Sequence, residues 1–157
     1  VLQFTGLPFF APEIFRTVEI ADPLRSKQLK LGLAQLGEEG AIQVFRPHLG
    51  NMLLLGAVGV LQFEVVTHRL QHEYQVAARI APAKYQLARW ITADDPKELQ
   101  RFIDANSHRI AYDAVDAPTF LASFGAELSV AQDNWPAIHF HKLREHAGLV
   151  FQNHTDV

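Results

Sequence analysis

Three histidines near the carboxyl end have a spacing that suits metal chemistry. His139 and His141 are two residues apart, which on a β-strand places both rings on one face, and His146 follows closely. Two or three imidazoles can bind zinc. The chain contains no cysteine, and Glu145 is the one obvious carboxylate nearby. We therefore favour a polar strand face near solvent over a metal site.

A second histidine pair, His68 and His72, has the four-residue spacing of helical zinc ligands. The zinc-protease pattern needs a glutamate directly after the first histidine to act as the base, and Arg69 stands there instead. Glu64 and Glu73 flank the pair. A solvated helix face is again the favoured interpretation, so we expect no metal site.

Two glycines, Gly56 and Gly59, precede a helical pattern, and backbone N–H groups at such a turn can bind an anion. A tight strand-to-helix turn explains the same residues, and we favour it. If Gly59 has a positive φ, Gly59→Val would strain the backbone. No Gly-Lys pair occurs in the chain, so the phosphate-binding motif of GTPases and ATPases is absent. We expect no catalytic residue and no cofactor on this chain.

Basic side chains occur on or beside several predicted strands. A face built from them could contact RNA phosphate or an acidic partner, whereas scattered surface charge is the alternative. The formal net charge of −3 argues against binding nucleic acid through the whole surface, but a local basic patch remains compatible with it. The candidate contact residues are Arg46, His48, Arg89, Lys142 and Arg144, with Arg16 as a further basic residue.

The first half of the chain has the pattern of a split βαβ unit. Residues 15–20 predict a strand, and Asp22-Pro23 then predicts a helix start, because aspartate accepts free N–H groups and proline fits the first helical position. Strands follow at 41–46 and 52–58, a helix at 60–74 with Leu61 and Val65 around its sides, and a strand at 75–80. The order β-α-β-β-α-β is ferredoxin-like, and we place this unit at 14–80.

The second half repeats the pattern after a short joint at 81–83. Strands are predicted at 85–92, 110–115, 118–124 and 138–143, and helices after Asp94-Asp95-Pro96 and over 125–135. This unit spans 84–146, and 147–157 has no periodicity and is expected to be a loose tail. The predicted fold class is therefore α+β, with two consecutive ferredoxin-like units forming one domain. The alternative explanation of the repeat is that two unrelated units use the same Asp-Pro signal between a strand and a helix.

The composition indicates a packed protein of one domain or two small ones. Hydrophobic residues make up 48% and charged residues 20%, which supports a continuous core and a monomer. The absence of cysteine excludes disulfides and thiolate catalysis and fits a reducing cytoplasm. No apolar run approaches the roughly 20 residues that span a bilayer, and residues 1–10 do not form a signal peptide. The chain is expected to begin inside a longer protein.

Several motifs in order carry a family resemblance. They are FTGLPFFAPE at 4–13, DPLRSKQL at 22–29, QLGEEG at 35–40, AIQVFRP at 41–47, GAVGVLQFE at 56–64, HRLQHEY at 68–74 and KLREH at 142–146. They resemble the release factor 3 family, the class II GTPases of bacterial translation termination. The match is dense over 4–80 and thinner over 81–143. The first unit also resembles the corresponding domain of elongation factor G.

The resemblance implies the C-terminal, ribosome-contacting domain of a three-domain factor that, with GTP, promotes dissociation of class I release factors. Residues 1–13 would join it to an upstream β-barrel domain, and the GTPase domain would lie further upstream. The resemblance carries no catalytic residue onto this chain, and GTP would be a cofactor of the full-length protein alone. The other hypothesis is a stand-alone ferredoxin-like regulatory pair that binds a small metabolite between its units. The ordered motifs favour the first.

Overall fold

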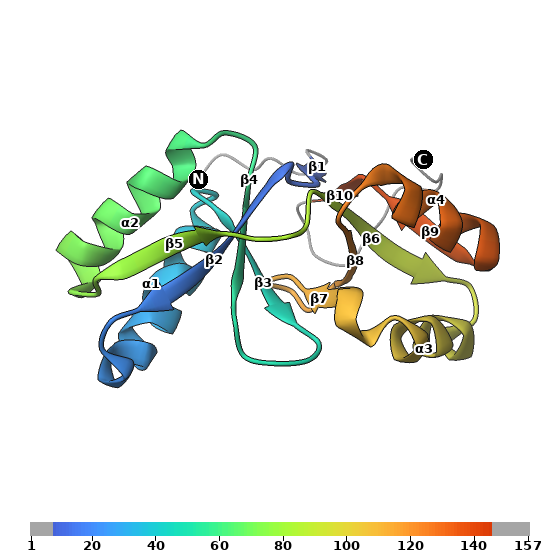
Figure 1. Cartoon of the computed structure of the whole chain (residues 1–157), viewed down its shortest axis with the longest axis horizontal. Coiled ribbons are helices and arrows are strands. Elements are labelled where there is room, and N and C mark those ends of the chain that lie inside the picture. The colour runs from blue at the N-terminus through green and yellow to red at the C-terminus, as the bar shows by residue number, and fades with distance from the viewer. Residues whose placement is uncertain (1–7, 146–157) are drawn as a thin grey trace.

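The computed structural model describes residues 8–145 (Figure 1). Its first half contains β1 (Pro8–Phe10), β2 (Ile14–Ile20), a 3₁₀ turn η1 (Pro23–Arg25), α1 (Ser26–Glu38), β3 (Gln43–Pro47), β4 (Leu54–Ala57), α2 (Leu61–Tyr74) and β5 (Ala78–Pro82). Its second half contains β6 (Leu87–Ala93), α3 (Pro96–Ala105), η2 (Ser107–Arg109), β7 (Ile110–Tyr112), β8 (Pro118–Ala122), α4 (Gly125–Asn134), β9 (Ile138–His141) and β10 (Leu143–Glu145).

Eight of these strands form one sheet in the order β5-β2-β4-β3-β7-β8-β6-β9. All neighbours whose pairing is described are antiparallel. Each half has the order β-α-β-β-α-β with its second strand at one edge, as in a split βαβ unit. The predicted α+β fold of two ferredoxin-like units is therefore confirmed.

The two units join where their edge strands, β3 and β7, pair with each other. Arg46 lies opposite Tyr112 and Pro47 opposite Ala111. An edge strand leaves unpaired backbone groups, so this pairing protects one edge of each unit. A separate ribbon pairs β1 with β10. The sequence predicted one strand over 138–143, but the structure divides it into β9 and β10, because β10 leaves the eight-stranded sheet to pair with β1. The segment that contains β1 and leads into β2, residues 8–13, is called the incoming chain below.

Aspartate and proline begin a helical segment in each unit, as predicted. The Asp95 carboxylate accepts a hydrogen bond from Lys97 N at 2.9 Å, and Pro96 is the first residue of α3. Asp22 accepts from Leu24 N at 3.0 Å, but it begins the turn η1, and α1 starts only at Ser26. At the end of α2, Gln75 has a φ of 54°, so it caps the helix and does not start the predicted strand.

Each unit places its two helices on one face of its own strands (Figure 1). In the first unit, Leu33 and Leu36 of α1 and Val66 and Leu70 of α2 are buried against the sheet. In the second unit the aromatic rings of Phe102, Phe120 and Phe140 form the centre. Phe102 and Phe140 meet edge to face with centroids 5.7 Å apart, a favourable aromatic geometry.

A third core lies between the units and is built from the helix-free faces of both half-sheets. Phe15, Phe45 and Leu54 of the first unit pack with second-unit side chains; these are Ala88, Ala111 and Leu121. The helix pairs consequently lie on opposite outer sides of the molecule, as Figure 1 shows. The covering of each apolar sheet face by the other unit stabilises the pair as one body.

A buried carboxylate holds the β7–β8 turn against β6. Asp113 Oδ2 accepts a hydrogen bond from Trp90 Nε1 at 3.0 Å, and its Oδ1 accepts from the N–H groups of Val115 at 3.0 Å and Ala117 at 2.9 Å. These bonds satisfy a polar group that would be costly to bury alone. The turn also holds Asp116 at a φ of 64°.

The expectation of strain at Gly59 is wrong. Its φ does not lie in the left-handed region, and a Cβ there would meet only Gln62 Oε1, at 4.0 Å. Gly56 on β4, in contrast, lacks space for a Cβ. A Cβ at Gly56 would lie 2.5 Å from Pro12 Cγ and 3.2 Å from Phe45 Cε2. The close approach of the incoming chain to β4 therefore requires glycine at position 56.

Gly56→Ala should destabilise the domain, because its methyl group would displace the rigid Pro12 ring or the buried Phe45. Overpacking of this kind costs about 1–3 kcal/mol, and each kcal/mol lowers the melting temperature of a chain this size by about 2–4 °C. The matched control is Gly59→Ala, which has open space and should change stability by less than about 1 kcal/mol. Thermal melts of the two variants check this, and equal melting temperatures would contradict it.

Candidate functional site

The carboxyl-end histidines do not form an assembled metal site among the described residues. His141 is buried, and its Nε2 lies 2.8 Å from the Thr92 hydroxyl oxygen. His139 Nε2 lies 3.6 Å from Asp94 Oδ1. Within residues 8–145 no group of three or more histidine, aspartate or glutamate side chains could hold a metal ion. The expected polar face near solvent holds for His139 but is wrong for His141, and His146 lies outside the described residues.

The α2 histidines lie on the solvent side of the helix, as expected. The ring centroids of His68 and His72 are 4.2 Å apart. Arg69, which replaces the zinc-protease glutamate, makes hydrogen bonds to Glu73 at 2.8 Å and to Glu39 at 2.5 Å. These bonds hold the pKa of both carboxyls below their usual value. Arg69 thus connects the end of α1 to α2, which is a structural role.

The turn at Gly59 before α2 is capped by the Gln62 side chain, which belongs to the first turn of the helix. Gln62 Oε1 accepts hydrogen bonds from Val58 N at 2.9 Å and Gly59 N at 3.0 Å. The Gln62 amide also donates to the carbonyl oxygen of Ala41 at 3.0 Å. Since the side chain occupies the donors that an anion would use, the geometry supports a strand-to-helix turn and not an anion site.

Arg46 and His48 lie beside the β3–β7 pairing. Arg46 forms an ion pair with Asp116 of the β7–β8 turn, and both side chains are largely exposed. Its guanidinium also lies 5.5 Å from the centroid of the Tyr112 ring, within cation–π range. His48 Nδ1 lies 2.8 Å from the Tyr112 hydroxyl, and burial raises the pKa of that phenol. The first unit supplies Arg46 and His48, and the second unit supplies their partners, Asp116 and Tyr112.

Arg89 and Lys142 line a different surface, a hollow of about 450 Å³. The incoming chain from Phe10 to Glu13, Val58 before α2, and Gln86 and Leu87 before and on β6 complete its lining. Lys142 is exposed, while Arg89 is half-buried and donates to the Ala88 carbonyl at 2.8 Å. Arg46 and His48 do not line this hollow.

Two basic residues remain, Arg144 and Arg16. The Arg144 side chain lies outside the described residues. Arg16 lies with its guanidinium 5.4 Å from the Phe63 ring centroid and donates to the Phe15 carbonyl at 3.0 Å. The five candidate contact residues therefore do not make one described patch: two lie at the β3–β7 pairing and two in the hollow.

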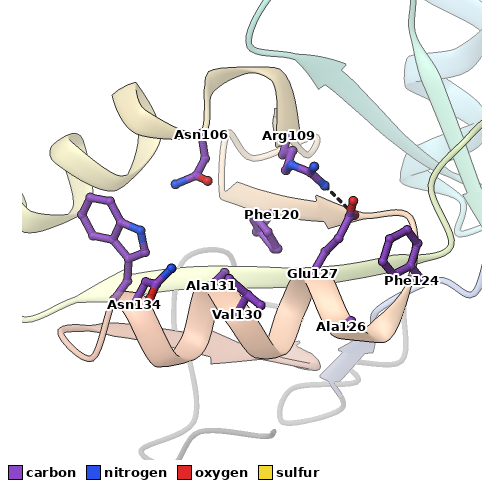
Figure 2. A pocket seen from close by; sticks show the side chains of 10 residues that line it. Asn106, Arg109, Phe120, Phe124, Ala126, Glu127, Val130, Ala131 and Asn134 are labelled. Atoms are coloured by element: carbon purple, nitrogen blue, oxygen red, sulfur yellow. Dashed lines mark ion pairs between the residues drawn. The ribbon is translucent and has the colours of Figure 1, made fainter.

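Sequence reasoning missed a groove between α4 and the end of α3 (Figure 2). It has a volume of about 300 Å³, and Phe124, Val130 and Trp135 contribute its apolar lining. Arg109 and Glu127 form an ion pair at its edge, and the Arg109 guanidinium lowers the pKa of the Glu127 carboxyl. The sequence signal was apolar Phe124 just before a short predicted helix and apolar Val130 within it. The pattern of so short a helix does not show which of its faces packs against the sheet.

Between the units the structure also has a hollow of about 260 Å³, lined by Phe10, Val44, Gln62 and Asp113 among others. No helix of the described residues is long and apolar enough to cross a membrane.

The fold and surface thus define a two-unit α+β domain with cationic surface sites and hollows between its units. The chain belongs to the family described as class II release factor RF3, C-terminal domain, whose profile matches residues 4–132.

Curated relatives agree with this family. The chain is 87% identical over 151 residues to "Peptide chain release factor 3" of Nitrosomonas europaea and 85% identical to that of Nitrosomonas eutropha. It is 62% identical over 155 residues to the protein of the same name from Bordetella petrii. These alignments cover 96%, 96% and 98% of this chain but 28%, 28% and 29% of the relatives. The chain spans less than a third of their length.

Gln62→Ala should destabilise the domain, because two N–H groups lose their acceptor and the Ala41 carbonyl loses its donor. Loss of a helix cap costs about 0.5–2 kcal/mol. Sulfate should then stabilise the variant more than the wild type, since the N–H groups become available to an anion. Gln71→Ala, at an exposed position of the same helix, is the control and should change stability by less than about 0.5 kcal/mol. Melting temperatures of both variants, measured with and without sulfate, test this prediction. Equal melting temperatures for the two variants would show that Gln62 does not act as a cap.

Proposed function

We propose that this chain is the non-catalytic C-terminal domain of a translational GTPase that contacts the ribosome and promotes recycling of class I release factors. The observation that carries the proposal is the match of residues 4–132 to the RF3 C-terminal family, together with relatives named peptide chain release factor 3. In this proposal GTP binds to an upstream domain, residues 1–13 lead from an upstream β-barrel domain, and the factor acts as a cytoplasmic monomer.

The physical requirement is linkage. GTP can drive a change on the ribosome only if the GTP form makes contacts there that the GDP form does not make. A domain without its own nucleotide site can supply that difference if it touches the ribosome and its position depends on the upstream nucleotide. A body in which two units share an inner core is suited to this role, because it moves as one piece.

The proposed contacts are the basic residues, namely Arg89 and Lys142 in the hollow, Arg46 and His48 at the β3–β7 pairing, and Arg144. Ribosomal RNA presents phosphates and ribosomal proteins present carboxylates, and both are bound by such side chains. Arg46 would exchange Asp116 for a ribosomal anion. An exposed ion pair contributes only about 0–1 kcal/mol, so this exchange costs little.

The second candidate function is a regulatory pair that binds a small metabolite. The observation in its favour is the pair of hollows between the units, of about 260 and 450 Å³, which is near the size range of small-molecule sites. A metabolite that raised the melting temperature of the domain in proportion to its concentration would support this function.

Deletion of residues 24–146 from the full-length factor should leave GTP binding near normal and abolish the stimulated release of class I factors. The reason is that the nucleotide site lies upstream in this proposal, whereas the contacts that make GTP productive are removed. Dissociation of a labelled class I factor from post-termination ribosomes measures the effect, with guanine nucleotide titration as the control. Recycling at the wild-type rate by the truncated protein would refute the proposal.

The double substitution Arg89→Gln with Lys142→Gln should weaken ribosome binding by the full-length factor and flatten its salt dependence. Each lost phosphate contact removes about 0.7–0.9 from the slope of log K against log salt, so the slope should fall by about 1.5. Lys27→Gln with Lys30→Gln, at exposed positions of α1, makes the same charge change and is the control. Equal slopes for both double variants would remove Arg89 and Lys142 from the contact.

A further inference from the structure

Four apolar side chains are exposed together where α2 begins. Val58 is 62% exposed, Val60 54%, Leu61 67% and Val65 50%. Single exposed apolar residues are ordinary on protein surfaces. A concentration of four within eight positions is different, because contiguous apolar surface marks an interaction site.

The packing of α2 does not need these side chains. The helix covers its own sheet with Phe63, Val66 and Leu70, all of which are buried. Leu61 and Val65 are one helical turn apart and lie on the opposite, solvent side of the helix. A surface helix normally keeps such residues on its core face, so the outward pair is available for a contact outside the domain.

The incoming chain passes beside this apolar surface. Phe10 is 61% exposed, and it lines the same two hollows as Val58. The peptide group that follows its Cα is fixed at both of its polar atoms, because Gln43 Nε2 donates to the Phe10 carbonyl at 2.8 Å and Ala11 N donates to the Lys142 carbonyl at 2.8 Å. The backbone is thus anchored to the domain while the ring remains in solvent.

We propose that the α2 apolar patch, defined as Phe10, Val58, Val60, Leu61 and Val65, docks against the part of the same polypeptide that precedes this chain. The relatives are more than three times as long as this chain, and the matched family is their C-terminal domain, so the remaining length precedes it. That length enters next to Phe10, which gives the preceding part a high effective concentration at the patch.

The patch also specifies the chemistry of its occupant. Glu64 is the one acidic residue in the first turn of α2, and the five residues of the patch are uncharged. The docking surface of the preceding part is therefore apolar where it faces these five residues, and polar where it borders the hollow of Arg89 and Lys142 beside Phe10 and Val58. This inference rests on the proposed function and deepens it: a nucleotide bound upstream can reposition this domain only through a physical contact, and the patch provides one.

The test uses thiol reactivity in the full-length factor. This chain has no cysteine, so Leu61→Cys and Leu31→Cys each place a single thiol on a helix surface once any cysteines outside it are removed. Leu31 lies on α1 and is 55% exposed, which makes it the matched control. The rate of maleimide alkylation is measured for each native variant and divided by its rate in denaturant. We expect the Leu61→Cys variant to react at least tenfold more slowly than the Leu31→Cys variant in the free factor.

Equal rates for the two variants would overturn the proposal. Equal rates in the free factor, followed by slower alkylation of the Leu61→Cys variant on ribosomes, would assign the patch to the ribosome and also overturn it. Protection of the Leu61→Cys variant that rises with factor concentration would indicate a second copy and would likewise overturn the proposal. The failure of this inference is distinct from failure of the proposed function, because alkylation of the free factor requires neither ribosomes nor recycling.

Discussion

The contact between the helix-free faces of the two half-sheets is the constraint on which the structure depends. Each ferredoxin-like unit covers only one face of its strands with helices, so its other apolar face needs a partner. Phe15 and Phe45 of the first unit meet Ala88 and Leu121 of the second, and pairing of β3 with β7 joins the same two half-sheets through their backbones. Burial of apolar surface thereby joins two units that would each expose an apolar face alone.

The surfaces proposed for function are consequences of this contact. Arg46 on β3 meets Asp116 and Tyr112 of the other unit. The hollow of Arg89 and Lys142 is closed by Phe10 and Val58 from the first unit and its incoming chain. Both places combine residues far apart in sequence, so both exist only while the inner core is intact. Mutations of the inner core should therefore impair these surfaces without touching them.

The sequence predicted the elements well and their surroundings less well. Asp95-Pro96 predicted the start of α3, because capping and a fixed proline φ act locally. Periodicity also predicted both units. It could not show that Leu61 faces solvent or that His141 is buried, because a pattern tells which residues share a face and not what covers that face. The restricted glycine, Gly56, was missed for the same reason: the clash is with Pro12, 44 positions earlier.

The central claim is that the two units act as one body which contacts the ribosome in a nucleotide-dependent way. Cryo-electron microscopy of the full-length factor on post-termination ribosomes, with a GTP analogue and with GDP, tests it most directly. The account predicts density between this domain and the ribosome in the GTP-analogue state, a changed position with GDP, and an unchanged inner core in both. A domain that touches no ribosomal component in either state, or units that separate across the β3–β7 pairing, would contradict it.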